Sequence, residues 1–121
     1  MINKIIVIGC GGTGSYLIPP LARLLKSSKF VGDLILVDGD NYEPSNLDRQ
    51  SFHVDLLGEN KATAQAKKLQ KEIEDFECGV IDTYLSESDV KEIVTEGTLV
   101  INCADNNAIR KYVEEIGRAH V

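Results

Sequence analysis

Cysteine is scarce in this sequence. The three cysteines are an odd number, lie far apart and include no C-x-x-C pair. They are Cys10, Cys78 and Cys103. Such a set provides neither a disulfide framework nor a zinc site, and it is typical of a protein in a reducing compartment. We therefore expect a cytoplasmic protein.

Basic residues are in the minority, because 13 Lys and Arg face 19 Asp and Glu, which gives a net charge of −6. A surface that binds nucleic acid needs clustered Lys and Arg. We therefore expect no nucleic-acid partner. Any phosphate group must then be bound by the backbone and by a few placed cations.

Long hydrophobic runs are missing as well. No apolar stretch approaches the roughly 18 residues of a membrane span, and the N-terminus lacks the basic and apolar regions of a signal peptide. The sequence also contains no internal repeat. With 43% hydrophobic and 26% charged residues, the composition is that of one soluble globular domain, and we expect no membrane association.

The strongest pattern lies at the start of the chain. The apolar run Ile5–Ile8 leads directly into Gly-Cys-Gly-Gly-Thr-Gly-Ser, residues 9–15. A β-branched run followed by G-x-G-x-x-G predicts a buried parallel strand and a turn into a helix whose N–H groups bind an anion. Gly9 allows the tight turn, Gly11 lets the backbone approach a phosphate, and Gly14 allows close packing of helix and strand. A glycine-rich turn that binds nothing would look the same.

Strands and helices alternate along the rest of the chain. Apolar runs predict further strands at residues 34–37, 79–81 and 98–101. Helical spacing and capping residues predict helices over 16–25 with a bend at Pro19-Pro20, over 62–76 after Asn60, between Ser86 and Gly97, and over 108–116. This alternation predicts an α/β fold, a Rossmann-like parallel sheet of about four strands with helices on both faces.

Acidic residues follow the second and fourth predicted strands. Asp38 lies 24 residues after Gly14, close to the position at which a Rossmann unit has the carboxylate that binds the ribose hydroxyls. A solvated turn aspartate is the alternative. Asp105 would face the same crevice, although Asp105 or Asn106 could instead only cap the last helix.

The segment between the second strand and the next helix, residues 41–57, has no sustained period. Its length and its hydrogen-bonding residues favour a functional loop. These residues are Asn46, Arg49, Gln50 and His53. Lys61 stands in the first turn of the following helix, where a cation opposes the helix dipole, so a nearby anion would account for it.

The segment Asp38–Gln50 resembles the ThiF/MoeB/HesA family of ubiquitin-activating-enzyme-like adenylyltransferases. That family combines a G-x-G-G-x-G-S loop, acid-x-acid, Ser-Asn-Leu, Arg-Gln, a lysine that opens the next helix, and Asp-Asn after the fourth strand. All of these occur here in the same order. The resemblance extends from Ile5 to about Tyr112 and corresponds to the nucleotide-binding half of a family member.

The resemblance implies that the protein binds ATP and Mg²⁺. It assigns phosphate binding to Gly9, Gly11, Gly12 and Gly14. It further implies an ATP-binding set in which Asp38 holds the ribose and Asn46, Arg49 and Lys61 contact the triphosphate, together with Asp40 and Gln50. Asp105 would hold the metal.

The implied reaction is attack by a carboxylate on the α-phosphorus of ATP, which gives an acyl-adenylate and pyrophosphate. Arg49, Lys61 and Asp105 would stabilise the charge that develops. The implied carboxylate is the C-terminal glycine of a ubiquitin-like or sulfur-carrier protein, and a homodimeric parent is compatible with the resemblance.

The resemblance also divides the chain. We expect residues 1–115 to be a partial ATP-binding Rossmann-like domain that is truncated at its C-terminus. Residues 116–121 match the in-frame translation of a common sequencing adapter, and we interpret them as a non-native tail. On this interpretation the 121 residues alone form no adenylate.

Two alternatives stay open at this point. An NAD-dependent oxidoreductase domain needs the same glycine loop and the same acid at Asp38, but it has no need for Asn46, Arg49-Gln50 and Lys61 together. A fragment without catalytic activity, which only packs or binds a partner, is the second alternative.

Overall fold

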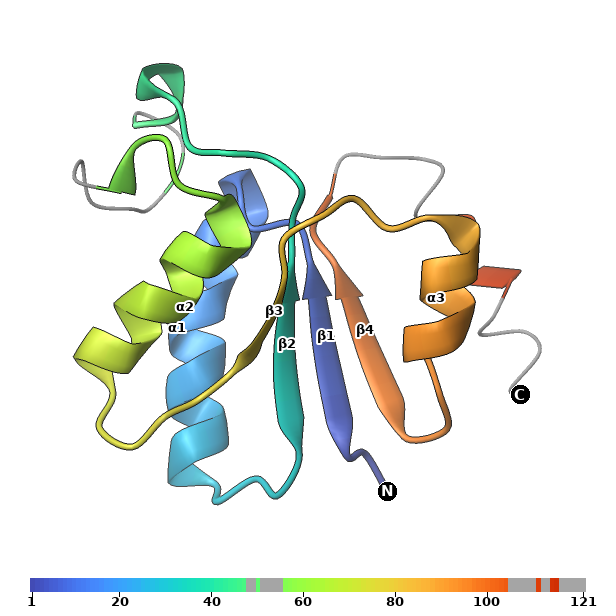
Figure 1. Ribbon diagram of the computed structural model, residues 1–121. Coiled ribbons are helices and arrows are strands. Elements are labelled where there is room, and N and C mark those ends of the chain that lie inside the picture. The colour runs from blue at the N-terminus through green and yellow to red at the C-terminus, as the bar shows by residue number, and fades with distance from the viewer. Residues whose placement is uncertain (48–49, 51–55, 105–110, 112–113, 116–121) are drawn as a thin grey trace.

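The computed structural model describes residues 1–47, 50, 56–104, 111 and 114–115 (Figure 1). In chain order its elements are β1 Lys4–Ile8, α1 Gly12–Ser27, β2 Asp33–Val37, the 3-10 helix η1 Pro44–Asn46, α2 Lys61–Glu72, β3 Gly79–Ile81, α3 Glu87–Ile93 and β4 Thr98–Asn102. The predicted alternation of strands and helices is confirmed. The predicted helix over 108–116 lies mostly outside the described residues. Within the described ranges, no helix has both the length and the apolar character needed to cross a bilayer.

The four described strands form one parallel sheet in the order β3-β2-β1-β4. β1 lies inside the sheet, where Ile6 is in register with Ile35 of β2 and with Val100 of β4. The chain therefore builds outward from β1 in both directions. In open α/β sheets, ligands bind at the carboxyl ends of the strands beside such a reversal of strand order.

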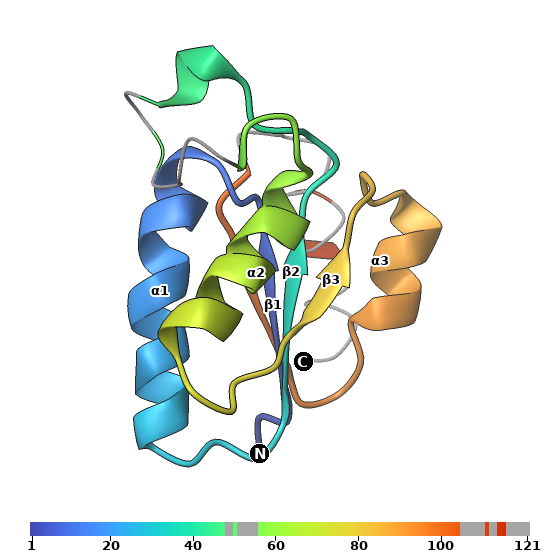
Figure 2. The same cartoon turned by 60° about the vertical axis from the view of Figure 1, so that its left-hand side comes forward.

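Helices cover both faces of this sheet, as the sequence predicts (Figure 1 and Figure 2). α1 and α2 lie on one face, where Val7, Ile18 and Leu69 belong to one buried cluster. α3 lies on the other face, where Val90 packs in a second cluster with Ile6. Because consecutive residues of β1 are buried on opposite faces, this strand has a continuous apolar sequence instead of an alternating one.

Two prolines lie inside α1 without dividing it. The helix is continuous from Gly12 to Ser27 with Pro19 and Pro20 in its middle. A proline inside a helix removes a backbone donor and crowds the preceding turn. The buried residues Ile18 and Ala22 pack against the sheet on either side of the prolines and hold the element together.

The two predicted N-caps, Asn60 and Ser86, are confirmed, but both helices end earlier than predicted. Asn60 Oδ1 accepts the Thr63 N–H at 3.0 Å, and Ser86 Oγ accepts the Asp89 N–H at 3.2 Å. α2 ends at Glu72 because the chain becomes extended at the next residue, Ile73, which still packs in the α1 and α2 cluster. The helical spacing of apolar residues therefore continues to Ile73, one residue beyond the end of the helix.

α3 likewise ends at Ile93, before the predicted stop signal. Gly97, with a φ of +84°, lies in the turn into β4 and does not close the helix. A positive φ suits this turn as well as a helix end, so the sequence alone could not distinguish the two.

Gly14 is expected to be intolerant of any side chain. A Cβ on Gly14 would lie 1.9 Å from the carbonyl oxygen of Gly9, whereas a Cβ on Gly12 would meet nothing within 4 Å. We expect Gly14→Ala to lower the free energy of unfolding by about 1 to 3 kcal/mol, because the backbone of Gly9 or of α1 has to move. Gly12→Ala is the matched control in the same helix and should not destabilise. Urea unfolding followed by circular dichroism measures both, and equal midpoints would contradict the close approach of α1 and β1.

Candidate functional site

A cleft of about 850 Å³ opens at the carboxyl end of the sheet. This volume lies in the range of small-molecule sites. Its walls come from the loop after β1, the end of β2, the start of α2, the segment after β3 and the end of β4. Seven of the residues proposed from the sequence line it: Gly9, Gly11, Gly12, Asp38, Asp40, Gln50 and Lys61.

The glycine loop begins where three strand ends meet. Gly9 has a φ of +96°, and its N–H donates to the carbonyl of Val37 at 2.8 Å. A Cβ on Gly9 would lie 2.7 Å from the backbone nitrogen of Ala104. Only glycine fits this close approach without strain, so the turn predicted at Gly9 is confirmed.

Asp38 ties the end of β2 to this loop. Its Oδ2 accepts the Cys10 N–H at 2.7 Å, and its Oδ1 accepts the Asp40 N–H at 2.9 Å. The carboxylate is therefore held by two backbone donors and is not simply solvated. It lies in the cleft wall, which is the location that the ribose prediction requires.

Lys61 is a nearly buried cation at the first position of α2. The residue is only 8% exposed. Its backbone N–H donates to the backbone carbonyl of Asp40 at 2.8 Å. Within the described part of the chain, Lys61 forms no salt bridge. The residue lines the cleft, and an ammonium group in largely covered surroundings without a counter-charge favours an anionic ligand.

Gln50 and Lys61 lie beside Gly11. A Cβ on Gly11 would lie 3.2 Å from Gln50 Nε2 and 3.3 Å from Lys61 Nζ. Gln50 Oε1 is buried and has no hydrogen-bond partner among the described residues. The absence of a side chain at Gly11 thus leaves room next to one cation and one amide, which is the environment expected around a phosphate.

Two predicted residues, Gly14 and Asn46, do not line the cleft. Gly14 packs against Gly9, as described above. Asn46 is buried in η1, where its Oδ1 accepts the N–H of Glu43 at 2.9 Å. Its side chain therefore has a local structural role, and its contact with a triphosphate stays a prediction.

Four candidates lie outside the described residues: Arg49, His53, Asp105 and Asn106. The triphosphate contact of Arg49 and the metal-binding role of Asp105 therefore stay predictions. In the ranges that the structure does describe, no group of three or more His, Cys, Asp or Glu side chains could hold a metal ion.

Part of the cleft wall was missed in the sequence. Thr83, Tyr84 and Leu85 line the cleft after β3. The Tyr84 hydroxyl donates to the Asp40 carboxylate, and a Cβ on Gly39 would lie 2.6 Å from the Tyr84 ring. The signal was available, because these residues directly follow a predicted parallel strand and the carboxyl ends of such strands form the site.

The cysteines have the properties of packing residues. Burial raises the pKa of the Cys10 thiol, and the nearby Asp38 carboxylate raises this pKa further. Burial also raises the pKa of Cys78 and of Cys103. A thiol with a raised pKa holds little thiolate at neutral pH. Cys103 packs against the core cluster of α1 and α2, so it is a packing residue and not a nucleophile.

Comparison with known proteins agrees with this architecture. The chain is 37% identical over 112 residues to the mouse protein "Adenylyltransferase and sulfurtransferase MOCS3". The aligned residues make up 92% of this chain and 23% of that protein. It is 29% identical over 109 residues to "Molybdopterin-synthase adenylyltransferase" of Escherichia coli, covering 89% of this chain and 42% of that protein.

Among solved structures, the chain is similar to E. coli tRNA N6-threonylcarbamoyladenosine dehydratase, TcdA, in complex with ATP. The TM-score is 0.82 at 25% sequence identity, and the match covers 97% of this chain and 47% of that one. The chain thus spans between about a quarter and about half of the length of these three relatives. A family model described as "ThiF family" matches residues 2–120, and the chain therefore belongs to the ThiF family.

Proposed function

We propose that the cleft binds ATP as a substrate and that a full-length protein containing this chain adenylates a carboxylate. The observation that carries this proposal is the position of Lys61: the residue is only 8% exposed, its Nζ lies beside Gly11 in the cleft, and it has no carboxylate partner among the described residues. A triphosphate supplies the missing negative charge. Relatives named adenylyltransferases and a related structure in complex with ATP support the choice of ligand.

The residues at the cleft fit the phosphate groups of ATP. The glycine loop leads into the N-terminus of α1, where unpaired N–H groups and the helix dipole favour an anion. The amide of Gln50 lies beside Gly11 and can donate its Nε2–H to a phosphate oxygen. Asp38 would bind the ribose hydroxyls from the end of β2, and Asp40 lies two residues further along the same wall.

In the proposed reaction a carboxylate oxygen attacks the α-phosphorus, and the bond from that phosphorus to the pyrophosphate oxygen breaks. Negative charge increases on the phosphate oxygens as this bond breaks. Lys61 is already fixed by the backbone of α2, so it can stabilise that charge without reorganising. No side chain of the protein has to form a covalent bond.

The proposal also includes Arg49 and Asp105, whose roles are taken from the resemblance of the sequence to the family. Arg49 would add a second cation, and Asp105 would hold Mg²⁺, a hard cation that prefers carboxylate oxygens and phosphate. Mg²⁺ would neutralise charge on the phosphates when bound. The proposed assignment of these two residues is independent of the role of Lys61.

The proposed acceptor is the C-terminal glycine of a ubiquitin-like or sulfur-carrier protein. Relatives named "Molybdopterin-synthase adenylyltransferase" and "SAMP-activating enzyme E1" support this class of acceptor. We extend the proposal to a homodimeric protein in the cytoplasm. The acceptor, the assembly and the compartment rest on resemblance and not on the geometry of the cleft.

ATP should bind in preference to NAD. Both ligands can use the glycine loop and Asp38, but only a triphosphate calls for the cation and the amide at Lys61 and Gln50. Calorimetric titration of the protein with each ligand measures this difference. Tighter binding of NAD would contradict the proposed function and favour a dinucleotide-binding domain.

Lys61→Ala should lower carboxylate-dependent exchange of pyrophosphate into ATP by about a hundredfold, which is the usual scale for the loss of one preorganised charge-stabilising group. The assay uses a full-length protein that contains this chain. Lys71→Ala is the matched control, because Lys71 is exposed in the last turn of the same helix. Wild-type exchange by a folded Lys61→Ala protein would remove Lys61 from the proposal.

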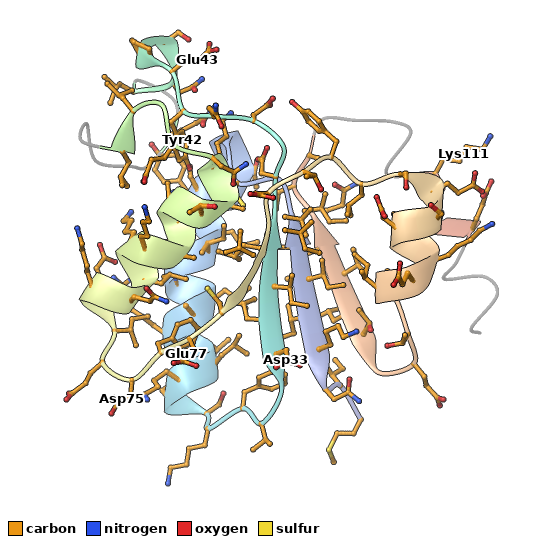
Figure 3. The ribbon with its side chains drawn as sticks, in the orientation of Figure 1. Asp33, Tyr42, Glu43, Asp75, Glu77 and Lys111 are labelled. Atoms are coloured by element: carbon orange, nitrogen blue, oxygen red, sulfur yellow. The ribbon has the colours of Figure 1, made fainter. Side chains whose placement is uncertain are left out.

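Asp38→Ala should weaken ATP binding with little change in kcat, because a ribose contact serves the ground state and the transition state equally. It should also lower the free energy of unfolding by about 1 to 3 kcal/mol, because the Cys10 N–H loses its acceptor. Asp38→Asn keeps one acceptor oxygen and should lose less stability. Asp33→Ala, at the opposite end of β2 (Figure 3), is the control. A fall in kcat with unchanged ATP affinity would contradict the ribose role.

A further inference from the structure

A buried tyrosine lies behind the glycine loop. Tyr42 is only 1% exposed and packs with Leu56 and Ala64. Figure 3 shows it near the start of α2, at the end of the sheet where the cleft opens. Tyr42 takes no part in the proposed reaction.

The Tyr42 hydroxyl joins the glycine loop to α2. It donates to the carbonyl oxygen of Cys10 at 2.6 Å and accepts the Nε2–H of Gln65 at 2.8 Å. A tyrosine hydroxyl has one proton. Gln65 Nε2 supplies the hydrogen in the bond between Gln65 and Tyr42. The hydroxyl proton of Tyr42 must therefore lie in the bond to the Cys10 carbonyl.

The backbone of Tyr42 is fixed as well. Its N–H donates to the carbonyl of Glu59 at 2.9 Å, and its carbonyl accepts the N–H of Gly58 at 2.8 Å. Burial raises the pKa of the Tyr42 hydroxyl above its ordinary value, so the group stays protonated as a donor throughout the physiological range. The hydroxyl is therefore a fixed donor at a fixed position.

This donor determines how the glycine loop is oriented. The Cys10 N–H is held by Asp38, and the Cys10 carbonyl is held by Tyr42. In a planar trans peptide the next N–H, that of Gly11, points away from the carbonyl and hence away from Tyr42. Holding both groups of Cys10 thus fixes the loop before a ligand arrives, which lowers the entropy that binding would otherwise lose.

The same tyrosine contacts the cation of the cleft. Lys61 Nζ lies 5.7 Å from the centroid of the Tyr42 ring, within the range of a cation–π interaction. Gln65 follows Lys61 by one helical turn and lies on the same side of α2. The pair Tyr42 and Gln65 therefore supports both groups that line the proposed phosphate site, the loop and the lysine.

We propose that Tyr42, held by Gln65, is a positioning residue that orients the glycine loop and Lys61 for the triphosphate. The inference rests on the proposed function, because it concerns the same cleft. It adds that the glycine loop is held on the side opposite the Gly11 N–H by a side-chain hydrogen bond from Tyr42, which lies in the segment between β2 and α2.

Tyr42→Phe is the test, because it keeps the ring beside Lys61 and removes only the hydroxyl. We expect the Kd for ATP to rise about tenfold, which corresponds to the loss of about one hydrogen bond. The Kd for adenosine, which has no phosphate, should change less than about twofold. Without nucleotide, amide hydrogen exchange at Cys10, Gly11 and Gly12 should become faster. Tyr16→Phe, at an exposed position of α1, is the matched control and should change none of these values.

A double variant separates positioning from general stability. In Tyr42→Phe with Gln65→Leu, the Nε2–H donor whose acceptor is the Tyr42 hydroxyl is removed as well, so part of the unfolding stability lost in Tyr42→Phe should return. ATP affinity should stay low, because the Cys10 carbonyl still lacks its donor. Recovery of ATP affinity together with stability would overturn the inference, and so would unchanged ATP affinity in Tyr42→Phe. If the wild-type protein bound no ATP, the proposed function itself would be overturned and the inference with it.

Discussion

The hydrogen bond from the Cys10 N–H to the Asp38 carboxylate holds the cleft together. It joins the ends of β1 and β2 at 2.7 Å, and as a charge-assisted bond it is stronger than a neutral one. The second oxygen of Asp38 holds the Asp40 N–H, and the Asp40 carbonyl in turn accepts the N–H of Lys61. The cation at the start of α2 is thus linked to the glycine loop through a short chain of bonds that begins at one carboxylate.

Much of the fold could be predicted because its determinants are local. The strands follow from continuous apolar runs such as Ile5–Ile8, which a sheet covered on both faces requires. Asn60 and Ser86 form caps with residues only three positions away. Once strands and helices were known to alternate, the rule for the carboxyl ends of parallel strands brought Gly11, Asp38 and Lys61 into one cleft.

The remainder depends on contacts that no local pattern contains. Gln65 is polar in sequence yet fully buried, and its partner Tyr42 lies 23 residues earlier, so the hydrogen-bonded pair is invisible to a search for periodicity. Asn46 was assigned to the phosphates by resemblance, while its carboxamide is engaged in η1. The end of α2 was placed too late because Ile73 is buried in the same core without being helical.

The pairing of β4 with β1 has a consequence for how the protein reaches its folded state. β1, α1, β2, α2 and β3 contact neighbours that are near in the chain, but the wall formed by Asn102 and Cys103 exists only after Thr98–Asn102 has paired with Lys4–Ile8. That pairing closes a chain segment of about ninety residues, and long closures form late because their entropy must be lost before the contacts are gained. During synthesis on the ribosome, the glycine loop would therefore emerge well before β4, whose end forms the opposite wall of the cleft.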